Sequence, residues 1–599
     1  MCRTLPLLTL ALALALGGNA QAQSAAAPTE TTWVTASNGH AQILLAAQAA
    51  FRPEAASNAG LVAYDDQVTD LGPDFAARYR AALATAKQEL ARRLANESDT
   101  NVRQDLEIML AAAQQMIDGS RLDEKYFLPW VDAPALVYRG VSRLLQEQNS
   151  PQRRAKALVR LQRYLGLAPG TTSAFVLAKA RYLERANDAK LLGPDREEIE
   201  QALANVPTYV EGIRKLFAQF PAEGAEAALS ALQTQADDYR DWLRQIVLPR
   251  ARHGVLLPAE IYAAALTEVG IDIAPELLMQ RARLEYMETR AAMQALAPLV
   301  AKARGLDDDN YVAVIRALKQ PQLARERIEP YYHEVQAALE QRIVEHGVVD
   351  LPKRPMQMRL GDEAESAAQP APHFQPAPLI GNTGEQGAFV LPLGNPGKSG
   401  ETSEQYDDFN FEAVAWTLSA HEGRPGHELQ FTAMVERGVS LARSLFAFNS
   451  VNVEGWALYA EAEMLPYEPL EGQLFALQFR LLRAARAMLD PMLNLGLIDR
   501  ERAGQLLLNE VGLSPAMTRQ ELDRYQFNMP GQAGAYFYGY ARLLELRMET
   551  ELTLGERFDR KAFNNFLLDQ GLLPPDLLAK AVREQFVPMM QARAAAKAD

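Results

Sequence analysis

The strongest constraint on the fold is a spacing of apolar residues that fits one face of an α-helix. Between residues 75 and 94 an apolar side chain returns every three or four positions, with Arg, Lys and Glu between. This is the period of an amphipathic helix. The pattern returns after residue 405, so the sequence predicts a mostly α-helical protein, a large helical array that forms a cleft. Before residue 350 the pattern predicts helices over residues 103–118, 135–147, 153–165, 195–217, 225–247, 275–303 and 327–346.

The helical spacing stops between residues 351 and 404, where proline and glycine become frequent. Residues 387–393 have the pattern of a short strand, and Pro392 near its end is typical of an edge strand because proline donates no ladder hydrogen bond. One interpretation is a linker without regular structure. The other is an exposed strand edge on which an extended peptide adds by backbone hydrogen bonds, with Phe389 among the substrate contacts.

These changes divide the chain into five parts. We expect a signal peptide over residues 1–22, a loose lead-in rich in Ala, Ser, Thr and Asn over 23–58, and an amino-terminal helical half over 59–350. The Pro/Gly-rich segment with the edge strand, residues 351–404, is a small β element before the helix of the candidate metal site. The carboxy-terminal helical half, residues 405–599, contains every candidate catalytic group.

The first residues have the layout of a secretory signal peptide. Arg3 precedes an apolar run from Leu5 to Leu16, and Ala20-Gln21-Ala22 is a small-residue cleavage site. The apolar run is shorter than the roughly 20 residues of a spanning helix, and no later segment has the pattern of a membrane span. We therefore expect a periplasmic or secreted protein with no membrane span.

Charge and cysteine content exclude two classes of function. The formal net charge is −14, and the sequence contains no cluster of basic residues. It therefore argues against a nucleic-acid partner. The single cysteine, Cys2, precedes the apolar run, so cleavage would leave neither a disulfide nor a thiol nucleophile.

Residues 421–427 read His-Glu-Gly-Arg-Pro-Gly-His and contain the only close pair among the seven histidines. Neutral imidazoles bind zinc, and an adjacent carboxylate, here that of Glu422, can take a proton from a metal-bound water. The segment therefore has the composition of a metal-activated hydrolase site.

The spacing within this segment differs from the usual pair of histidines four residues apart on one helix face. His421 and His427 are six residues apart, so on a continuous helix they would point about 120° away from each other. Pro425 and Gly426 interrupt the helix. We therefore predict a helix over residues 411–422, a bend, and a second helix from residue 427 that brings both imidazoles to one point.

A second segment supplies two carboxylates. Glu454 and Glu461 lie seven residues apart in a helical run rich in Ala, Leu and Trp, so they share a helix face. Burying a carboxylate there is costly unless it is paired or bound to a metal. One glutamate as third metal ligand and the other as hydrogen-bond acceptor for a ligand histidine would offset that cost. The alternative is a pair of solvated glutamates at a helix edge.

A third segment, residues 530–540, combines glycines with three tyrosines. A tyrosine hydroxyl is a common donor to the oxyanion that forms when water attacks a carbonyl, and Tyr536 or Tyr540 is the candidate. The alternative is an aromatic cluster that only packs.

The three segments, in this order, resemble a bacterial family called domain of unknown function 885, over roughly residues 60–590. The resemblance implies a mostly helical, exported or lipid-anchored protein that is distantly similar to helical zinc metallopeptidases. Matched by motif, it implies that His421, His427 and Glu454 hold the metal, that Glu422 is the general base, and that Tyr536 is the tyrosine after the Pro-Gly-Gln run. The residues expected behind the ligands or around the substrate are Glu461, Phe389, Tyr540 and Arg524.

The chain departs from this family at three positions where many members carry histidine. They are Glu428, Asn494 and Asn564. If those histidines aid transition-state stabilisation or substrate binding, rate or specificity would differ in this protein.

Together these observations predict a peptidase with one zinc ion that hydrolyses short peptides, a substrate preference implied by the relatives. The alternative is a periplasmic protein that binds peptides without cutting them and has a retained or degenerate metal site. A serine hydrolase has little support, because the chain lacks a Gly-x-Ser-x-Gly elbow after the leader. The oligomeric state, the native metal and the position of cleavage stay open.

Overall fold

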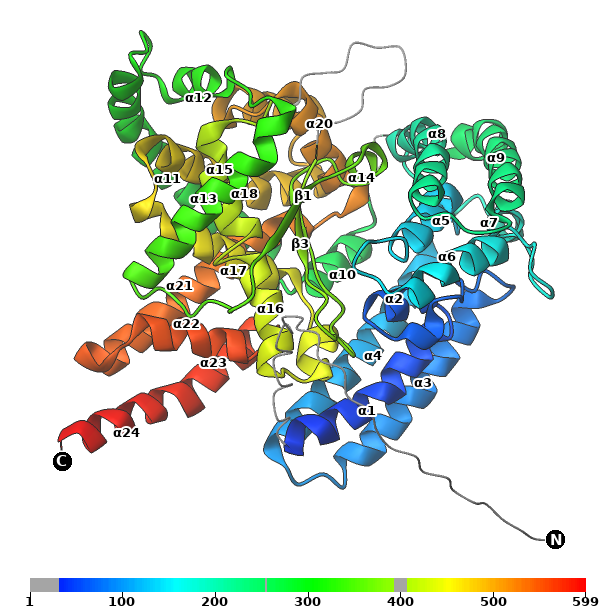
Figure 1. The fold of residues 1–599 in the computed structure, drawn as a ribbon, viewed down its shortest axis with the longest axis horizontal. Coiled ribbons are helices and arrows are strands. Elements are labelled where there is room, and N and C mark those ends of the chain that lie inside the picture. Colours follow the sequence, from blue (N-terminus) through cyan, green and yellow to red (C-terminus); the bar gives the residue numbers. More distant parts are fainter. Residues whose placement is uncertain (1–31, 254–255, 393–406, 599) are drawn as a thin grey trace, which may run out of the picture.

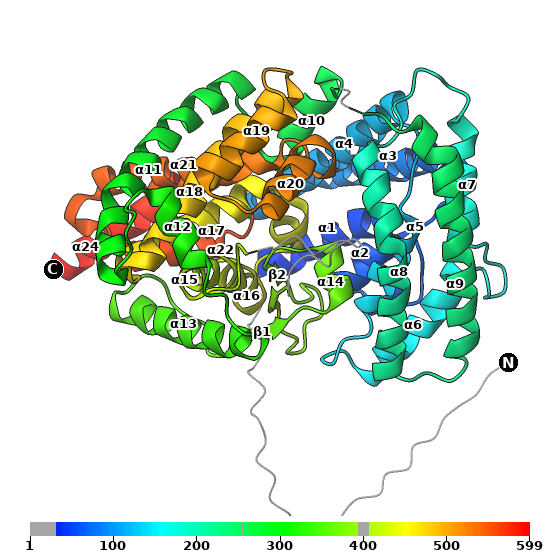
Figure 2. The same ribbon diagram turned by 90° about the horizontal axis from the view of Figure 1, so that it is seen from above.

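The computed structural model describes residues 32–253, 256–392 and 407–598, and the predicted signal peptide lies outside them. Helices dominate the described chain, as predicted (Figure 1). Two views at right angles show α1 to α9 on one side and most of the later helices on the other (Figures 1 and 2). None of the described helices combines the length and the apolarity that a membrane span requires.

Thirteen α-helices lie in the described chain between residues 32 and 345. Polar caps begin many of them: the Asp99 carboxylate, for example, accepts hydrogen bonds from two backbone N–H groups at the start of α4. The predicted ranges agree with the structure to within a few residues at most ends. These helices are α1 (Thr32–Ala49), α2 (Pro53–Asn58), α3 (Phe75–Leu94), α4 (Thr100–Tyr126), α5 (Ala133–Ser142), α6 (Pro151–Tyr164), α7 (Ala174–Arg185), α8 (Arg196–Gln219), α9 (Ala225–Trp242), α10 (Ala259–Val269), α11 (Pro275–Arg304), α12 (Tyr311–Lys319) and α13 (Arg325–Glu345).

The prediction of a loose lead-in over residues 23–58 is wrong for its described part. Helices α1 and α2 occupy it, and α1 buries Ala41 and Leu44 completely against the core. Small residues give α1 little amphipathic contrast, yet they allow it to pack closely against α3 and α4. The many small residues of this segment therefore led to a wrong prediction of loose structure.

Of the remaining helices, α14 lies within a short β element and the others follow it. The remaining helices are α14 (Glu363–Ala368), α15 (Glu412–Glu422), α16 (His427–Arg437), α17 (Ser450–Met464), α18 (Leu470–Asn494), α19 (Arg500–Leu506), α20 (Pro515–Asp523), α21 (Ala535–Leu554), α22 (Arg560–Asp569), α23 (Pro575–Ala581) and α24 (Val587–Ala598).

The β element is a three-stranded sheet in which β3 (Ala388–Leu391) is the central strand. Strand β1 (Gln357–Leu360) pairs with it in parallel and β2 (His373–Gln375) in antiparallel orientation. The prediction that residues 387–393 form an edge strand is therefore wrong. Pro392 follows the last strand residue, so it removes no ladder hydrogen bond.

Phe389 is correspondingly not a substrate contact. Its side chain is fully buried, and its ring packs edge to face with that of Tyr332 on α13, with centroids 5.8 Å apart. The free edges of the sheet belong to β1 and β2, and β2 reaches the candidate metal site.

Two large apolar cores and one small cluster hold the described helices together. One lies among α5 to α9. The larger one joins α1, α3 and α4 to the carboxy-terminal helices, so the amino-terminal helices contribute directly to the core beneath the candidate site.

A buried polar cluster lies at this junction. Asp105 on α4 is fully buried and accepts hydrogen bonds from Ser37 Oγ on α1 (2.6 Å), Ser440 Oγ (2.5 Å) and Arg443 Nε (2.9 Å). One carboxylate on α4 thus connects α1 to residues 440–443, which follow α4 by more than 300 residues.

Candidate metal centre

The predicted bend is present between α15, which ends at Glu422, and α16, which begins at His427. Gly426 makes the turn possible, because a Cβ atom there would lie 1.9 Å from the His421 carbonyl oxygen. The Trp456 indole on α17 donates to the carbonyl oxygens of Pro425 (3.0 Å) and Gly426 (3.3 Å). The bend brings the imidazoles of His421 and His427 to a centroid distance of 4.8 Å.

Glu454 on α17 completes a group of three ligand atoms that lie within 4.8 Å of one another. Its Oε2 is 3.6 Å from His421 Nε2 and 3.4 Å from His427 Nε2. Two ligands on a tetrahedral zinc with bonds of about 2.0–2.2 Å are separated by about 3.3–3.6 Å. Glu454 Oε2 is also buried without a hydrogen-bond partner among the described residues. The two separations to Glu454 and the N, N, O donor set fit one zinc ion.

The electrostatics of the site favour a cation. Burial lowers the pKa of His421, but the nearby carboxylates of Glu454, Glu461 and Glu422 raise that pKa to about 9. Burial likewise opposes ionisation of Glu454, yet the two imidazoles hold the pKa of that carboxyl well below its usual value. Three carboxylates around one buried imidazole thus attract positive charge, which a proton or a metal ion supplies.

Glu461 has the contacts predicted for a residue behind the metal ligands. Its Oε1 is 2.6 Å from His421 Nδ1, and its other oxygen accepts a hydrogen bond from Thr417 Oγ1 at 2.8 Å. Arg483 on α18 lies 3.3 Å from Oε1. Burial opposes its charge, but Arg483 and His421 lower the pKa of Glu461 below its usual value. The carboxylate therefore orients His421 with Nε2 toward the ligand cluster.

Glu422 is held with one oxygen toward the ligands. Its Oε1 lies 3.9 Å from His421 Nε2, while Oε2 accepts the backbone N–H of Phe374 at 2.8 Å. Phe374 belongs to β2, so the small sheet orients the expected general base through its main chain. Sequence reasoning missed this contact, because a backbone N–H has no residue-type signature.

Tyr536, at the start of α21, lies beside the ligands, with its ring nearly parallel to that of His421 and 6.2 Å from it. Arg524 Nη2 donates to the tyrosine oxygen at 3.0 Å and to Gln532 Oε1 at 2.6 Å. Gln532 Nε2 in turn donates to Glu454 Oε1 at 3.5 Å. Gln532, which sequence reasoning also missed although it lies in the Pro-Gly-Gln run, links the tyrosine to a ligand.

Tyr540, the other candidate oxyanion donor, packs one turn further along α21. The guanidinium of Arg480 lies over its ring at 5.3 Å, and the side chain belongs to the apolar core. The structure therefore brings Tyr536, and not Tyr540, to the ligand cluster.

The three positions where many family members carry histidine have structural partners in this chain. Glu428 forms a buried ion pair with Arg424 at 2.5 Å. Asn494 donates to the backbone oxygens of Asp490 and Tyr525. Asn564 donates to the backbone oxygen of Val348 and accepts from Tyr459. None of these hydrogen bonds involves a ligand residue.

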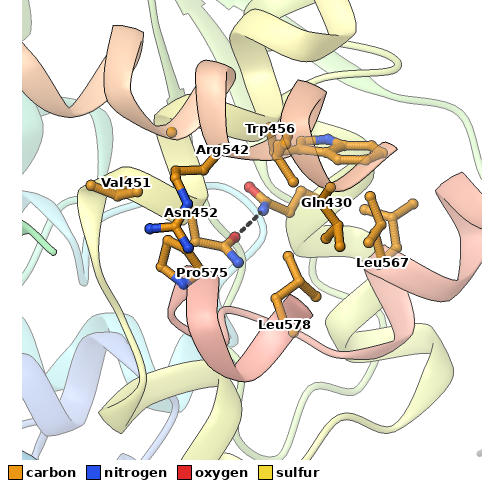
Figure 3. Close-up of a pocket in the computed structure, with 13 residues that line it drawn as sticks. Gln430, Val451, Asn452, Trp456, Arg542, Leu567, Pro575 and Leu578 are labelled. Carbon is orange, nitrogen blue, oxygen red and sulfur yellow. Dashed lines mark hydrogen bonds between the residues drawn. The ribbon is translucent and has the colours of Figure 1, made fainter. Parts of the chain in front are cut away.

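A cavity of about 20 Å³ is lined by residues of α16, α17, α21, α22 and α23 (Figure 3). At its wall Gln430 Nε2 on α16 donates to Asn452 Oδ1 on α17 at 2.9 Å, which ties the helix of His427 to that of Glu454. The space is enough for a single water molecule.

Helices α17 and α21, which carry Glu454 and Tyr536, touch through their backbones. A Cβ atom at Gly455 would lie 2.6 Å from the carbonyl carbon of Gly539, and one at Gly539 would lie 1.9 Å from the Val451 oxygen. Glycine at both positions permits this approach.

Comparisons with known proteins identify relatives of this fold. A predicted lipoprotein from Colwellia psychrerythraea superposes with a TM-score of 0.74 and 17% identity, over 92% of this chain and 99% of that one. A predicted lipoprotein of unknown function from Shewanella oneidensis gives a TM-score of 0.68 and 19% identity, over 92% of this chain and 100% of that one. No curated protein matches the sequence. The model of the family described as bacterial protein of unknown function (DUF885) matches residues 53–582, so this chain belongs to that family.

Proposed function

We propose that this protein is a zinc-dependent peptidase that hydrolyses short peptides. The observation that carries the proposal is the convergence of His421, His427 and Glu454 at ligand spacing, with the carboxylate of Glu422 beside them. The His421 ring is oriented by Glu461, as in many protein zinc sites.

Each nearby side chain has a role in this reaction. A zinc ion held by the three ligands would lower the pKa of a coordinated water and polarise the substrate carbonyl. As the water oxygen attacks the carbonyl carbon, Glu422 accepts a proton from the water and then delivers it to the leaving amine nitrogen. The peptide C–N bond breaks, and the products are a carboxylic acid and an amine.

Tyr536 is suited to stabilise the charge that develops on the carbonyl oxygen. Because Arg524 donates to the tyrosine oxygen, the proton of the hydroxyl is free to bond to the substrate. Burial raises the pKa of Tyr536, which keeps the hydroxyl protonated at neutral pH.

We also propose that the protein works outside the cytoplasm. The signal peptide predicted over residues 1–22 supports this location, as do the two structural relatives described as predicted lipoproteins. A short-peptide substrate agrees with the low exposure of the ligand side chains, from 4% for His421 to 15% for Glu454, because a folded protein would not reach them.

The test is to measure the zinc content and peptide cleavage of the purified mature protein and of Glu422→Gln. We expect about one zinc ion per chain in both proteins and a loss of at least about 100-fold in kcat for the variant, since general-base catalysis contributes 10²–10⁴-fold. Glu468→Gln is the matched control: Glu468 is buried but does not contact the ligands, and burial raises the pKa of its carboxyl well above the usual value. A metal-free protein, or full activity of Glu422→Gln, would exclude this mechanism.

The alternative of a peptide-binding protein predicts a different outcome. Tight binding of peptides by calorimetry with no turnover in the parent protein, despite full zinc occupancy, would decide for this alternative.

A further inference from the structure

Three arginine side chains surround Tyr536. The guanidinium carbons of Arg486, Arg524 and Arg483 lie 4.7, 5.4 and 5.6 Å from the centre of the tyrosine ring. They come from two elements, since Arg483 and Arg486 are one turn apart on α18 and Arg524 follows α20. We call these three residues the arginine cluster.

Within the cluster, only Arg486 has a carboxylate of its own. Glu521 accepts two hydrogen bonds from it, both at 2.6 Å, and a third from the Tyr525 hydroxyl at 2.7 Å. Arg524 donates to the neutral groups of Gln532 and Tyr536, and its separation from Glu521 is 3.9 Å. Glu521 is therefore already engaged by Arg486.

Arg483 has unused hydrogen-bonding capacity. It shares Glu461 with His421 and Thr417 at a distance of 3.3 Å, while its Nε and Nη1 have no partner among the described residues. The residue is nevertheless only 4% exposed. Buried guanidinium groups are normally paired, because an unpaired buried charge is costly.

The cluster thus has three positive charges and two carboxylates, Glu461 and Glu521. The remaining positive charge lies beside Tyr536, the residue expected to bind the substrate carbonyl. Arginine presents a planar fork of N–H donors that matches the two oxygens of a carboxylate. An anionic group of the substrate would restore the charge balance.

We propose that Arg524 and Arg483 bind a carboxylate of the substrate close to the cleaved bond. This inference rests on the proposed peptidase function and narrows it to a substrate class. The guanidinium groups are less than 6 Å from the Tyr536 ring, and consecutive residues of a peptide are 3.8 Å apart, so the carboxylate lies within about two residues of the cleaved bond. It belongs either to the free carboxyl terminus or to an acidic side chain at that position.

The experiment compares four peptides that share one acetylated sequence. Two end in a free carboxylate and two in an amide, and within each pair the residue after the cleaved bond is Glu or Gln. If the carboxyl terminus is the group that binds, the zinc-loaded protein cleaves both free peptides with a kcat/KM about 10- to 100-fold above that of their amides, the range for a hydrogen bond to a charged group. If an acidic side chain binds, the Glu peptides show that advantage over the Gln peptides whatever their terminus.

Variants then assign the preference to the cluster. Arg524→Gln should lose most of the preference for the carboxylate-bearing peptide, and Arg524→Lys should retain part of that preference. In both variants the loss should come from a higher KM for the preferred peptide. The matched control is Arg542→Gln, because Arg542 is equally exposed (21% against 22%) and lies over the ring of Tyr538 at 5.7 Å, outside the cluster. It should keep the full preference.

The outcomes separate this inference from the proposed function. Cleavage of all four peptides at equal rates overturns the inference and leaves the peptidase standing, as does an undiminished preference in a folded Arg524→Gln. No cleavage of any peptide by the zinc-loaded protein overturns both. The comparison of peptides uses the unmodified protein, so it can overturn the inference even if Arg524→Gln fails to fold.

Discussion

At the scale of single residues, the candidate site depends on a row of alternating charges. Arg483 contacts Glu461, Glu461 contacts His421, and His421 faces the ligand position. All three are almost completely buried, so water does not screen their interactions. The negative charge of the Glu461 carboxylate should therefore control how strongly His421 binds a metal.

Replacing Glu461 by Gln should weaken zinc binding by about 10- to 100-fold, the usual effect of removing a carboxylate behind a ligand histidine. The reason is that an amide accepts a weaker hydrogen bond from His421 Nδ1 and leaves Arg483 without its carboxylate. Competition with a chromophoric chelator measures the affinity. Glu468→Gln is again the control, and an unchanged affinity in Glu461→Gln would show that this carboxylate does not tune the ligand.

The sequence predicted the residues whose chemistry depends on side-chain type. Residue type indicates His421 and His427, the cost of burying carboxylates indicates Glu454 and Glu461, and the family resemblance implies Glu454 as the ligand; the structure brings all four together. The N–H of Phe374 was not predictable, because it acts through the main chain and comes from a strand 48 residues away.

At the scale of elements, the bend between α15 and α16 decides whether there is a site at all. The chain turns so sharply that no Cβ atom fits at position 426 beside the carbonyl oxygens of His421 and Ala420. The Trp456 indole donates to two buried carbonyl groups of the turn, those of Pro425 and Gly426. The helix of Glu454 therefore supports the bend as well as contributing a ligand.

Gly426→Ala should open the bend and reduce zinc binding. The new methyl group would meet backbone oxygens at 1.9 and 2.4 Å, and backbone moves less easily than a side chain. We expect a loss of at least about 2 kcal/mol in the free energy of unfolding, within the range of overpacked buried sites, together with a lower zinc content.

Gly119→Ala provides the matched control, because Gly119 lies inside α4 with no atom within 4 Å of its added Cβ. It should stabilise the protein by about 0.5–1 kcal/mol. Thermal melting with and without a chelator measures both effects. Wild-type stability and zinc content in Gly426→Ala would mean that the turn relaxes without moving His427.

Helices were predictable from the sequence where an apolar stripe was long. The pairing partners of the strand were not predictable. The pattern of residues 387–393 identified β3 but not its neighbours, because pairing with residues 357–360 and 373–375 depends on contacts distant in sequence. For α1, small side chains blurred the stripe that reveals α3.

At the scale of the whole molecule, the buried Asp105 joins the amino-terminal helices to the segment after α16. Arg443, its charged partner, is only 4% exposed. Breaking such a pair leaves a buried charge without compensation, so this junction should contribute strongly to stability.

Asp105→Asn should lower the free energy of unfolding by about 3–5 kcal/mol. Asp118→Asn on the same helix is the control: its ion pair with Arg121 is solvent-exposed, and we expect a change below about 1 kcal/mol. Urea denaturation followed by circular dichroism measures both variants. Equal stability of the two would mean that the halves are held by apolar packing alone.

The paired glycines 455 and 539 determine how α17 and α21 lie against each other. Because backbone meets backbone there, the separation between Glu454 and Tyr536 does not depend on which larger side chains fill the rest of the interface. Changes in those larger side chains should therefore leave this separation unaltered. A single methyl group at either glycine would instead meet backbone of the facing helix and displace α17 from α21.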